Sequence, residues 1–386
     1  MKRFFITLWM CLIFLPILVA ADNDSPLYGS AVFKGGEYGS KYYRIPVLTV
    51  MPDGSLLAIA DKRIEHNGDL PAKIDVVARR STDNGHTWSD YFTVVENDSI
   101  GGCGDAAVVV DRVTGDVVMI FNRGGGFIKD PRPDIMITRS SDNGHTWSRP
   151  FSINRQIFTD LPSGDPGKIN VTSAFATSGN AVQLDDGRIL FALVTRRQGV
   201  REHKVYAVYS DDGGNTWNVS NTPASNDGDE SKIVELPDGT LLMSVRNRYR
   251  SRKYDNRRLF SYSTDKGVTW NDDMTTVEHL VDPSCNGDII LYRRDGKEVL
   301  LHSLPHSLDK RENVTVFGSE DLGSSFPHRH KVSSGISAYS SLAVLPDGNI
   351  GILVEEAEEK IDAEGGQPYD INFYAIPQFW NSSAQE

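Results

Sequence analysis

Two short sequence signals recur in alternation along the chain, and this repetition constrains the fold more than any other feature. The first is a tight-turn dipeptide that ends in glycine and lies between two apolar runs, with successive copies 52 to 72 residues apart. The copies are Asp53-Gly54, Thr114-Gly115, Asp186-Gly187, Asp238-Gly239, Asp295-Gly296 and Asp347-Gly348. Because short apolar segments joined by such a dipeptide are typical of β-hairpins, the sequence predicts six hairpin units.

The second signal follows each of the first five turns after 27 to 31 residues, and it has the form Ser-x-Asp-x-Gly-x-Thr-Trp. Its copies begin at Ser81, Ser140, Ser210, Ser263 and Ser319, and the last one ends in Ser-Phe instead of Thr-Trp. The short polar side chains can bond their own backbone, the glycine accepts a positive φ, and the aromatic ring can lie under the turn. We therefore interpret the motif as a rigid hairpin corner with a structural role.

An alternating stretch before each motif copy, such as 204–209, is typical of a half-buried strand. Each unit therefore offers about four strands and almost no helical pattern, and six such units around an axis form a β-propeller. The repeats of a linear β-solenoid are much shorter. We predict an all-β fold, a six-bladed β-propeller of four-stranded antiparallel blades, as one domain over residues 22–386. The sixth unit lacks the motif, and we expect its final segment, 372–376, to close the ring against residues 31–33.

Residues 1–21 are expected to form a secretory signal peptide. Two basic residues precede an apolar run from Phe4 to Val19, which two alanines follow. The run is short for a membrane-spanning helix, which needs about 20 residues, and no later stretch approaches that length. We therefore expect a secreted or periplasmic protein with no membrane span after signal cleavage. Its two remaining cysteines, Cys103 and Cys285, could pair or stay free.

The charge balance argues against a nucleic-acid partner. Forty Lys and Arg residues stand against 52 Asp and Glu residues, which gives a formal net charge of −12 at pH 7. No basic stripe interrupts this acidic excess, so the phosphate contacts that hold nucleic acids are not expected. An anionic ligand would need a local cationic pocket.

The repeats and one further segment resemble the sialidase (neuraminidase) family. That family combines several Asp-box repeats with a Tyr/Phe-Arg-Ile-Pro segment near the mature N-terminus, which here is Tyr43-Arg44-Ile45-Pro46. The resemblance runs from about residue 28 to 378. It implies a propeller with its site at one end of the axis, and an exo-α-sialidase that removes terminal α-linked sialic acids with retention of configuration. The partners it implies are sialylated oligosaccharides, glycoproteins or glycolipids, and we expect a monomer.

The family holds the substrate carboxylate with three arginines, and Arg44, Arg246 and Arg311 match their positions. A guanidinium suits this role because its planar fork pairs bidentately with a carboxylate and stays charged at any useful pH. Arg293 and Arg294 compete with Arg311 for the third position, although they flank a predicted hairpin turn.

The resemblance also implies a catalytic set, with Tyr339 as nucleophile, Glu230 as its partner, and Asp69 as general acid and base. A neutral phenol suits the attack because a carboxylate nucleophile would be repelled by the carboxylate on the anomeric carbon. Since a phenol has a pKa of about 10, it needs a neighbouring group to take its proton. Arg63 and Asp105 resemble family positions that contact O4 and the N-acyl side of the sugar.

Two alternatives remain open from the sequence. The same residues are compatible with transfer of sialic acid to another sugar or with release of an anhydro sugar. A catalytically inactive propeller that binds sialylated glycans is the alternative from another class of protein. Motifs of serine hydrolases, zinc proteases and phosphate-binding loops do not occur, and the closely spaced histidine pairs lack an evident carboxylate partner. We therefore predict no metal site and no cofactor.

Overall fold

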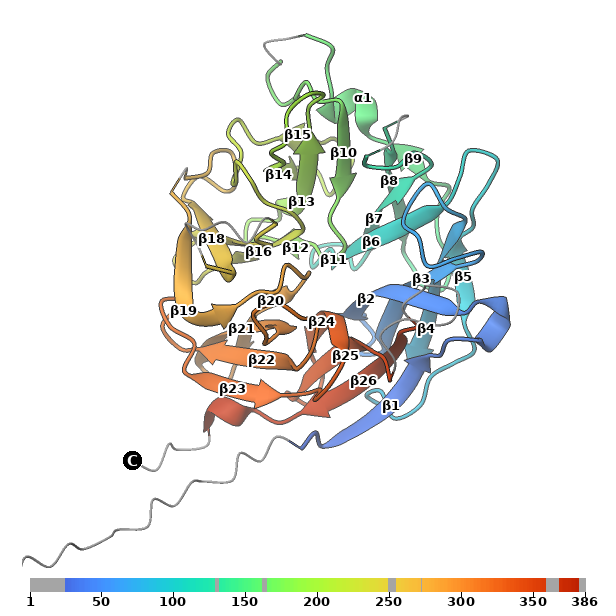
Figure 1. The fold of residues 1–386 in the computed structure, drawn as a ribbon, viewed down its shortest axis with the longest axis vertical. Coiled ribbons are helices and arrows are strands. Elements are labelled where there is room, and N and C mark those ends of the chain that lie inside the picture. The colour runs from blue at the N-terminus through green and yellow to red at the C-terminus, as the bar shows by residue number, and fades with distance from the viewer. Residues whose placement is uncertain are drawn as a thin grey trace, which may run out of the picture.

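The computed structural model describes residues 25–128, 132–161, 165–248, 255–271, 273–358 and 368–381. In these residues six β-sheets stand around a common axis, which is viewed end-on in Figure 1. The expected signal peptide, 1–21, lies outside the described residues. Within them, no helix is long and apolar enough to cross a bilayer.

Four of the sheets are the four-stranded antiparallel blades that the repeats predict. Blade 1 comprises β2 (Tyr42–Val50), β3 (Leu56–Arg63), β4 (Ile74–Ser81) and β5 (Phe92–Val95). Blade 4 comprises β16 (Ser231–Glu235), β17 (Leu241–Val245), β18 (Arg257–Ser263) and β19 (Thr275–Val281). Blade 5 comprises β20 (Asp288–Arg294), β21 (Lys297–Pro305), β22 (Val314–Ser319) and β23 (His328–Lys331). Blade 6 comprises β24 (Ser337–Val344), β25 (Ile350–Glu356), β26 (Asp370–Ile376) and β1 (Tyr28–Phe33).

Blades 2 and 3 each gain a fifth strand. Blade 2 comprises β6 (Cys103–Val110), β7 (Val117–Arg123), β8 (Asp134–Ser140), β9 (Phe151–Ser152) and β11 (Gly179–Asn180). Blade 3 comprises β10 (Ser173–Ala176), β12 (Val182–Gln183), β13 (Ile189–Arg196), β14 (Lys204–Ser210) and β15 (Asn218–Val219). The remaining elements are the short helices α1 (Asn154–Ile157), η1 (Glu37–Gly39) and η2 (Phe379–Asn381).

The extra strand arises because the inner strand of blade 3 is broken. Both β10 and β12 pair with β13, but between them the chain crosses to blade 2, where β11 runs parallel to β6. Gly179 allows this crossing, since its φ of +107° lies in a region that side chains rarely adopt. The blades are therefore not uniformly antiparallel, and residues 177–181 reach the axis of the propeller.

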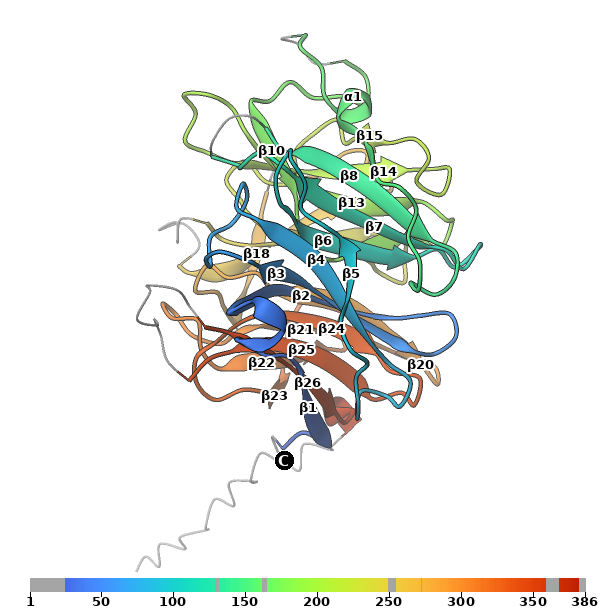
Figure 2. The same cartoon turned by 90° about the vertical axis from the view of Figure 1, so that its right-hand side faces the viewer.

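The ring closes between the first and last described strands, as the sequence predicts. Strand β1 pairs antiparallel with β26, with Tyr28 opposite Ala375 and Ala31 opposite Asn372. Figure 1 shows these two strands side by side in blue and red, and Figure 2 shows the same pair from the side. Blade 6 is thus assembled from both ends of the described chain.

The repeated Ser-x-Asp motif forms the hairpin corners that the sequence predicts. In the copy at blade 3, one carboxylate oxygen of Asp212 accepts bonds from the Ser210 hydroxyl and the Thr216 backbone N–H, each at 2.8 Å. Trp217 is buried under this turn, where its indole N–H donates to the Gly214 carbonyl oxygen at 2.9 Å. Its ring lies 5.4 Å from that of Phe191, in the apolar core between blades 2 and 3.

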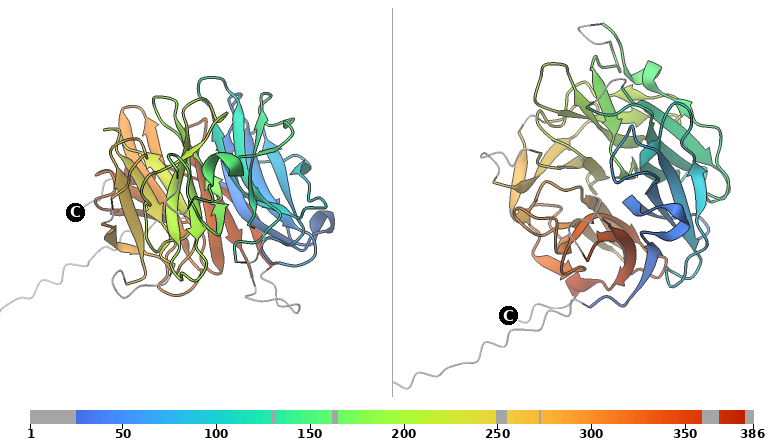
Figure 3. Two further views of the ribbon diagram at one scale, coloured as in Figure 1. Left: turned by 90° about the horizontal axis from the view of Figure 1, so that it is seen from above. Right: turned by 45° about the vertical axis from the view of Figure 1, so that its right-hand side comes forward.

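The repeat also decides where side chains of different blades meet. Because each blade follows the same strand order from the axis outwards, its innermost strand begins at the same end of the ring. Figure 3 shows the blades standing side by side in two further views. Residues at the start of β2, β6, β16 and β24, and in the loops at that end, therefore face one common space.

Candidate active site

The eight residues predicted for the site all lie at this end of the propeller. Their places are Arg44 in β2, Arg63 at the end of β3, Asp69 in the following loop, Asp105 in β6, Glu230 just before β16, Arg246 just after β17, Arg311 in the loop before β22 and Tyr339 in β24. A cavity of about 870 Å³ is lined by five of them, Asp69, Asp105, Glu230, Arg246 and Tyr339. The other three are arginines that contact residues of its wall.

Tyr339 and Glu230 form a short hydrogen bond in the cavity wall. The Tyr339 hydroxyl donates to Glu230 Oε2 at 2.5 Å, and Arg246 Nη1 lies 2.5 Å from the same oxygen and 3.2 Å from the phenol oxygen. Both side chains of the pair are buried. Burial, and then the charge of Glu230, raise the pKa of Tyr339 well above 10, although Arg246 and Arg311 oppose this. The phenol is therefore protonated at neutral pH and donates to the carboxylate.

Three guanidinium groups surround Tyr339. The central carbons of Arg44 and Arg311 lie 5.2 and 5.5 Å from the centroid of the Tyr339 ring, while Arg246 contacts its hydroxyl. The structure thus brings together the three arginines that the sequence predicts. Arg293, one competitor for the third position, lies at the opposite end of β20, where it pairs with Asp185 at 3.2 Å.

Glu355 on β25 bonds both Arg44 and the backbone of Tyr339, and no feature of the sequence indicated it. One of its oxygens accepts from Arg44 Nε and from the Ile45 N–H, both at 2.7 Å, and the other accepts from the Tyr339 N–H at 3.2 Å. The Ile45 bond explains the unusual backbone of the Tyr-Arg-Ile-Pro segment, because Ile45 has a φ of +61° at a bulge between β2 and β3. Burial lowers the pKa of Arg44, but the charge of Glu355 outweighs this effect, and the pKa lies above its usual value. Arg44 is therefore a cation.

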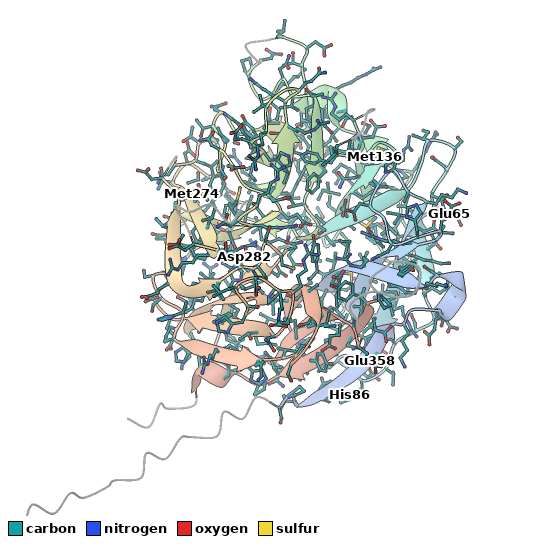
Figure 4. The ribbon with its side chains drawn as sticks, viewed as in Figure 1. Glu65, His86, Met136, Met274, Asp282 and Glu358 are labelled. Carbon is teal, nitrogen blue, oxygen red and sulfur yellow. The ribbon has the colours of Figure 1, made fainter. Side chains whose placement is uncertain are left out.

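Arg63 and Asp69 form an ion pair at another part of the wall. Arg63 Nη2 donates to Asp69 Oδ1 at 2.7 Å, and Arg63 also bonds the Asn67 carbonyl oxygen. The Arg63 side chain is only 1% exposed, whereas that of Asp69 is 83% exposed. The loop after β3, on which Figure 4 labels Glu65, therefore places the exposed Asp69 at the cavity, where the buried Arg63 holds it.

Asp105 lies in the cavity wall as part of an acidic pair. Its φ is +55°, its N–H lies 3.1 Å from the buried carboxylate of Asp61, and its own carboxylate accepts from Asn122 at 3.3 Å. Burial, and then the charges of Asp69 and Glu230, raise the pKa of Asp105 to about 7. Asp61 gave no signal in the sequence, because it stands in an ordinary strand pattern.

Two further findings bear on the sequence predictions. Cys103 and Cys285 are both buried and free, which answers the question of their pairing. Among the described residues, no group of three or more His, Cys, Asp or Glu side chains is placed to hold a metal ion. The polar side chains that line the cavity are arginines, carboxylic acids, the phenol of Tyr339, and Lys73, Asn122, His66 and His203. The apolar part of its wall includes Leu70, Phe127 and Phe175.

Comparison with known proteins gives a consistent result. A family model described as a BNR repeat-like domain matches residues 54–352. A sialidase of Micromonospora viridifaciens is 34% identical over 357 residues, which cover 86% of this chain and 53% of that relative. A sialidase of Paraclostridium sordellii is 31% identical over 352 residues, 82% of each chain. The solved structure of a Hadza microbial sialidase is similar with a TM-score of 0.77 at 27% identity, over 91% of this chain and 68% of that one.

The repeats, the closed six-bladed ring and these similarities define one class of protein. The chain belongs to the sialidase family of enzymes. It spans about half the length of the Micromonospora relative, 53%, and most of the length of the Paraclostridium relative, 82%.

The buried ion pair between Arg44 and Glu355 generates a prediction on stability. Replacing Glu355 by Ala leaves a buried guanidinium without its countercharge, which should lower the free energy of unfolding by about 3–5 kcal/mol. Glu298→Ala is the matched control, because its pair with Arg293 is solvent-exposed and should contribute at most about 1 kcal/mol. Urea unfolding at pH 7 measures both. Equal small losses would show that Glu355 does not anchor Arg44.

Proposed function

We propose that this protein is a secreted or periplasmic exo-α-sialidase that hydrolyses terminal α-linked sialic acids with retention of configuration. Its substrates would be sialylated oligosaccharides, glycoproteins or glycolipids. The observation that carries the proposal is the 2.5 Å hydrogen bond from Tyr339 to Glu230 in a cavity wall surrounded by three arginines. Secretion rests on the N-terminal segment of the sequence alone.

The three arginines would hold the substrate by its carboxylate. Sialic acid carries this group on the anomeric carbon, and a charged hydrogen bond to a guanidinium contributes on the order of 1.5–3 kcal/mol. Since Arg44, Arg246 and Arg311 all lie around Tyr339, a carboxylate bound between them brings the anomeric carbon towards the phenol oxygen. The acidic surface of the protein makes this local cluster of cations the site for an anion.

Tyr339 would then attack the anomeric carbon while Glu230 accepts its proton. A bond forms between the phenol oxygen and the anomeric carbon, and the bond to the leaving-group oxygen breaks. Asp69, on the exposed side of the cavity, would take up a proton from solvent, pass it to that leaving oxygen, and afterwards take a proton from the water that attacks the intermediate. The phenol oxygen leaves in this second step and recovers its proton from Glu230. Two displacements at one carbon give net retention.

The role of Tyr339 as nucleophile can be tested by substitution. Tyr339→Phe removes the attacking oxygen, so turnover of a fluorogenic sialoside should fall by about a hundredfold or more while the sugar still binds. Tyr374→Phe is the matched control, since this tyrosine in the same blade also donates to a glutamate, Glu356, at 2.6 Å but lies outside the cavity lining. Its turnover should equal that of the wild type.

Two outcomes would contradict the proposal. If the wild type binds sialylated glycans without cleaving them, and Tyr339→Phe changes nothing, the protein is a glycan-binding propeller. If lactose in excess yields a sialylated lactose, or the product is an anhydro sugar, the same residues perform transfer instead of hydrolysis.

The binding of the substrate carboxylate by the three arginines can be tested by conservative substitution. Changing Arg44, Arg246 or Arg311 to Lys keeps the charge but loses the planar fork, which should cost about 2–4 kcal/mol of transition-state stabilisation, measured from kcat/KM. Arg293→Lys serves as the control and should change little, because it lies at the opposite end of β20. If Arg311→Lys keeps wild-type kinetics while Arg293→Lys loses activity, the third arginine is wrongly assigned.

A further inference from the structure

A second group of buried polar side chains lies beside Glu230, and the mechanism above does not use it. Lys232 is the second residue of β16, which Glu230 immediately precedes, and Asn286 lies two residues before Asp288, the first residue of β20. Hydrogen bonds between Lys232, Asn286 and Glu230 show that neighbouring blades 4 and 5 bring these side chains together.

Hydrogen bonds connect the buried lysine to the carboxylate of Glu230. Lys232 Nζ donates to Asn286 Oδ1 at 2.9 Å, and Asn286 Nδ2 donates to Glu230 Oε1 at 3.4 Å and to the Ser178 hydroxyl at 3.2 Å. The other oxygen of Glu230, Oε2, accepts from Tyr339 and Arg246. The two carboxylate oxygens thus have different partners. Oε2 contacts the phenol and Arg246, whereas Oε1 contacts Asn286.

The position of Lys232 is fixed by the backbone that crosses from blade 3. A Cβ atom at Gly179 would lie 2.4 Å from Lys232 Cε, so the lysine chain occupies the space left by the glycine. Lys232 is 3% exposed. Burial lowers its pKa to about 8, although the charges of Asp288 and Glu230 oppose this. A buried ammonium is costly unless anions compensate it, and Glu230 is one of the two carboxylates placed to do so.

We propose that Lys232 is a positioning residue that acts on Glu230 through Asn286, where it holds the carboxylate oxygen Oε1 and places a positive charge next to it. The inference rests on the proposed role of Glu230 as the group that accepts the Tyr339 proton. That step needs the carboxylate within hydrogen-bond distance of the phenol, and the bond from Asn286 to Oε1 restricts its rotation away from Tyr339.

Other charged groups and Tyr339 also face Glu230, and the cations among them differ from Lys232 in the partners that they contact. They are Asp229 beside it, Arg246 after β17, Arg258 on β18, Tyr339 on β24 and Asp105 on β6. Arg258 is already paired with Asp282, which Figure 4 labels near the centre of the ring, at 3.1 Å. Arg246 faces the cavity, where the substrate anion would engage it. Lys232 differs from Arg246 because it does not line the cavity and is connected to Glu230 through Asn286.

The test is the pH profile of kcat/KM for Lys232→Met. Loss of the cation should raise the midpoint of the acidic limb by about one pH unit and leave the alkaline limb unchanged, because a positive charge beside the site opposes the uptake of a proton there. Lys62→Met is the matched control, since the Lys62 ammonium donates to Tyr91 on blade 1, away from Glu230. A lower kcat/KM at every pH with an unmoved acidic limb would overturn the inference, because that is what a purely structural role produces.

A second variant tests whether the effect passes through Asn286. Asn286→Leu keeps the size of the side chain and removes its three hydrogen bonds, including those to Lys232 and Glu230, so it should shift the acidic limb in the same direction. The double variant should shift it no further than Lys232→Met does, since both changes break one path. Additive shifts would overturn the inference. Should Lys232→Met fail to fold, an unmoved acidic limb in Asn286→Leu would overturn it equally.

Glu230→Gln distinguishes failure of this inference from failure of the proposed function. If Glu230→Gln keeps wild-type turnover, the proposed role of Glu230 is wrong, and the inference falls with it. If Glu230→Gln loses turnover while Lys232→Met and Asn286→Leu keep the wild-type acidic limb, only the role of Lys232 is wrong.

Discussion

The pairing of β1 with β26 is the interaction on which the geometry of the site depends. It joins the two ends of the described chain into one blade and so closes a ring of six sheets. A closed ring has no open edge between its first and last blades, and it fixes the innermost strands around one axis. Only then do Glu230 beside blade 4 and Tyr339 on blade 6 share one cavity wall, with Arg44 of blade 1 against the Tyr339 ring.

Within that ring, the wall around Tyr339 is built from largely buried charges that compensate one another. Arg44 is paired with Glu355, and Arg246 with Glu230, at 2.7 and 2.5 Å. In a medium of low dielectric constant the two charges of such a pair attract each other strongly, and a buried charge without its partner lowers the stability of the fold. The arrangement leaves guanidinium groups beside a neutral phenol, which suits an anionic substrate whose reacting carbon lies next to its charge.

The sequence predicted the blades because their determinants are local. A turn dipeptide and a Ser-x-Asp corner each act within a few residues, and their repetition implies the ring. The site residues followed from resemblance to a family, and the structure brings them together. The role of Glu355 was not predicted, because two glutamates at the end of an apolar strand are typical of a solvent-exposed strand end. The crossing at Gly179 escaped because β11 exists only through its contact with β6, which lies far away in sequence.

The proposed reaction passes through a covalent intermediate on Tyr339, and the stereochemistry of the first released product tests this step. A proton NMR time course on an α-linked sialoside, recorded faster than the free sugar mutarotates, identifies the anomer that the enzyme releases. Two displacements predict that the α anomer of the free sugar appears first and that the β anomer grows in later. If the β anomer appears first, water attacks the anomeric carbon directly, and Tyr339 is not the nucleophile.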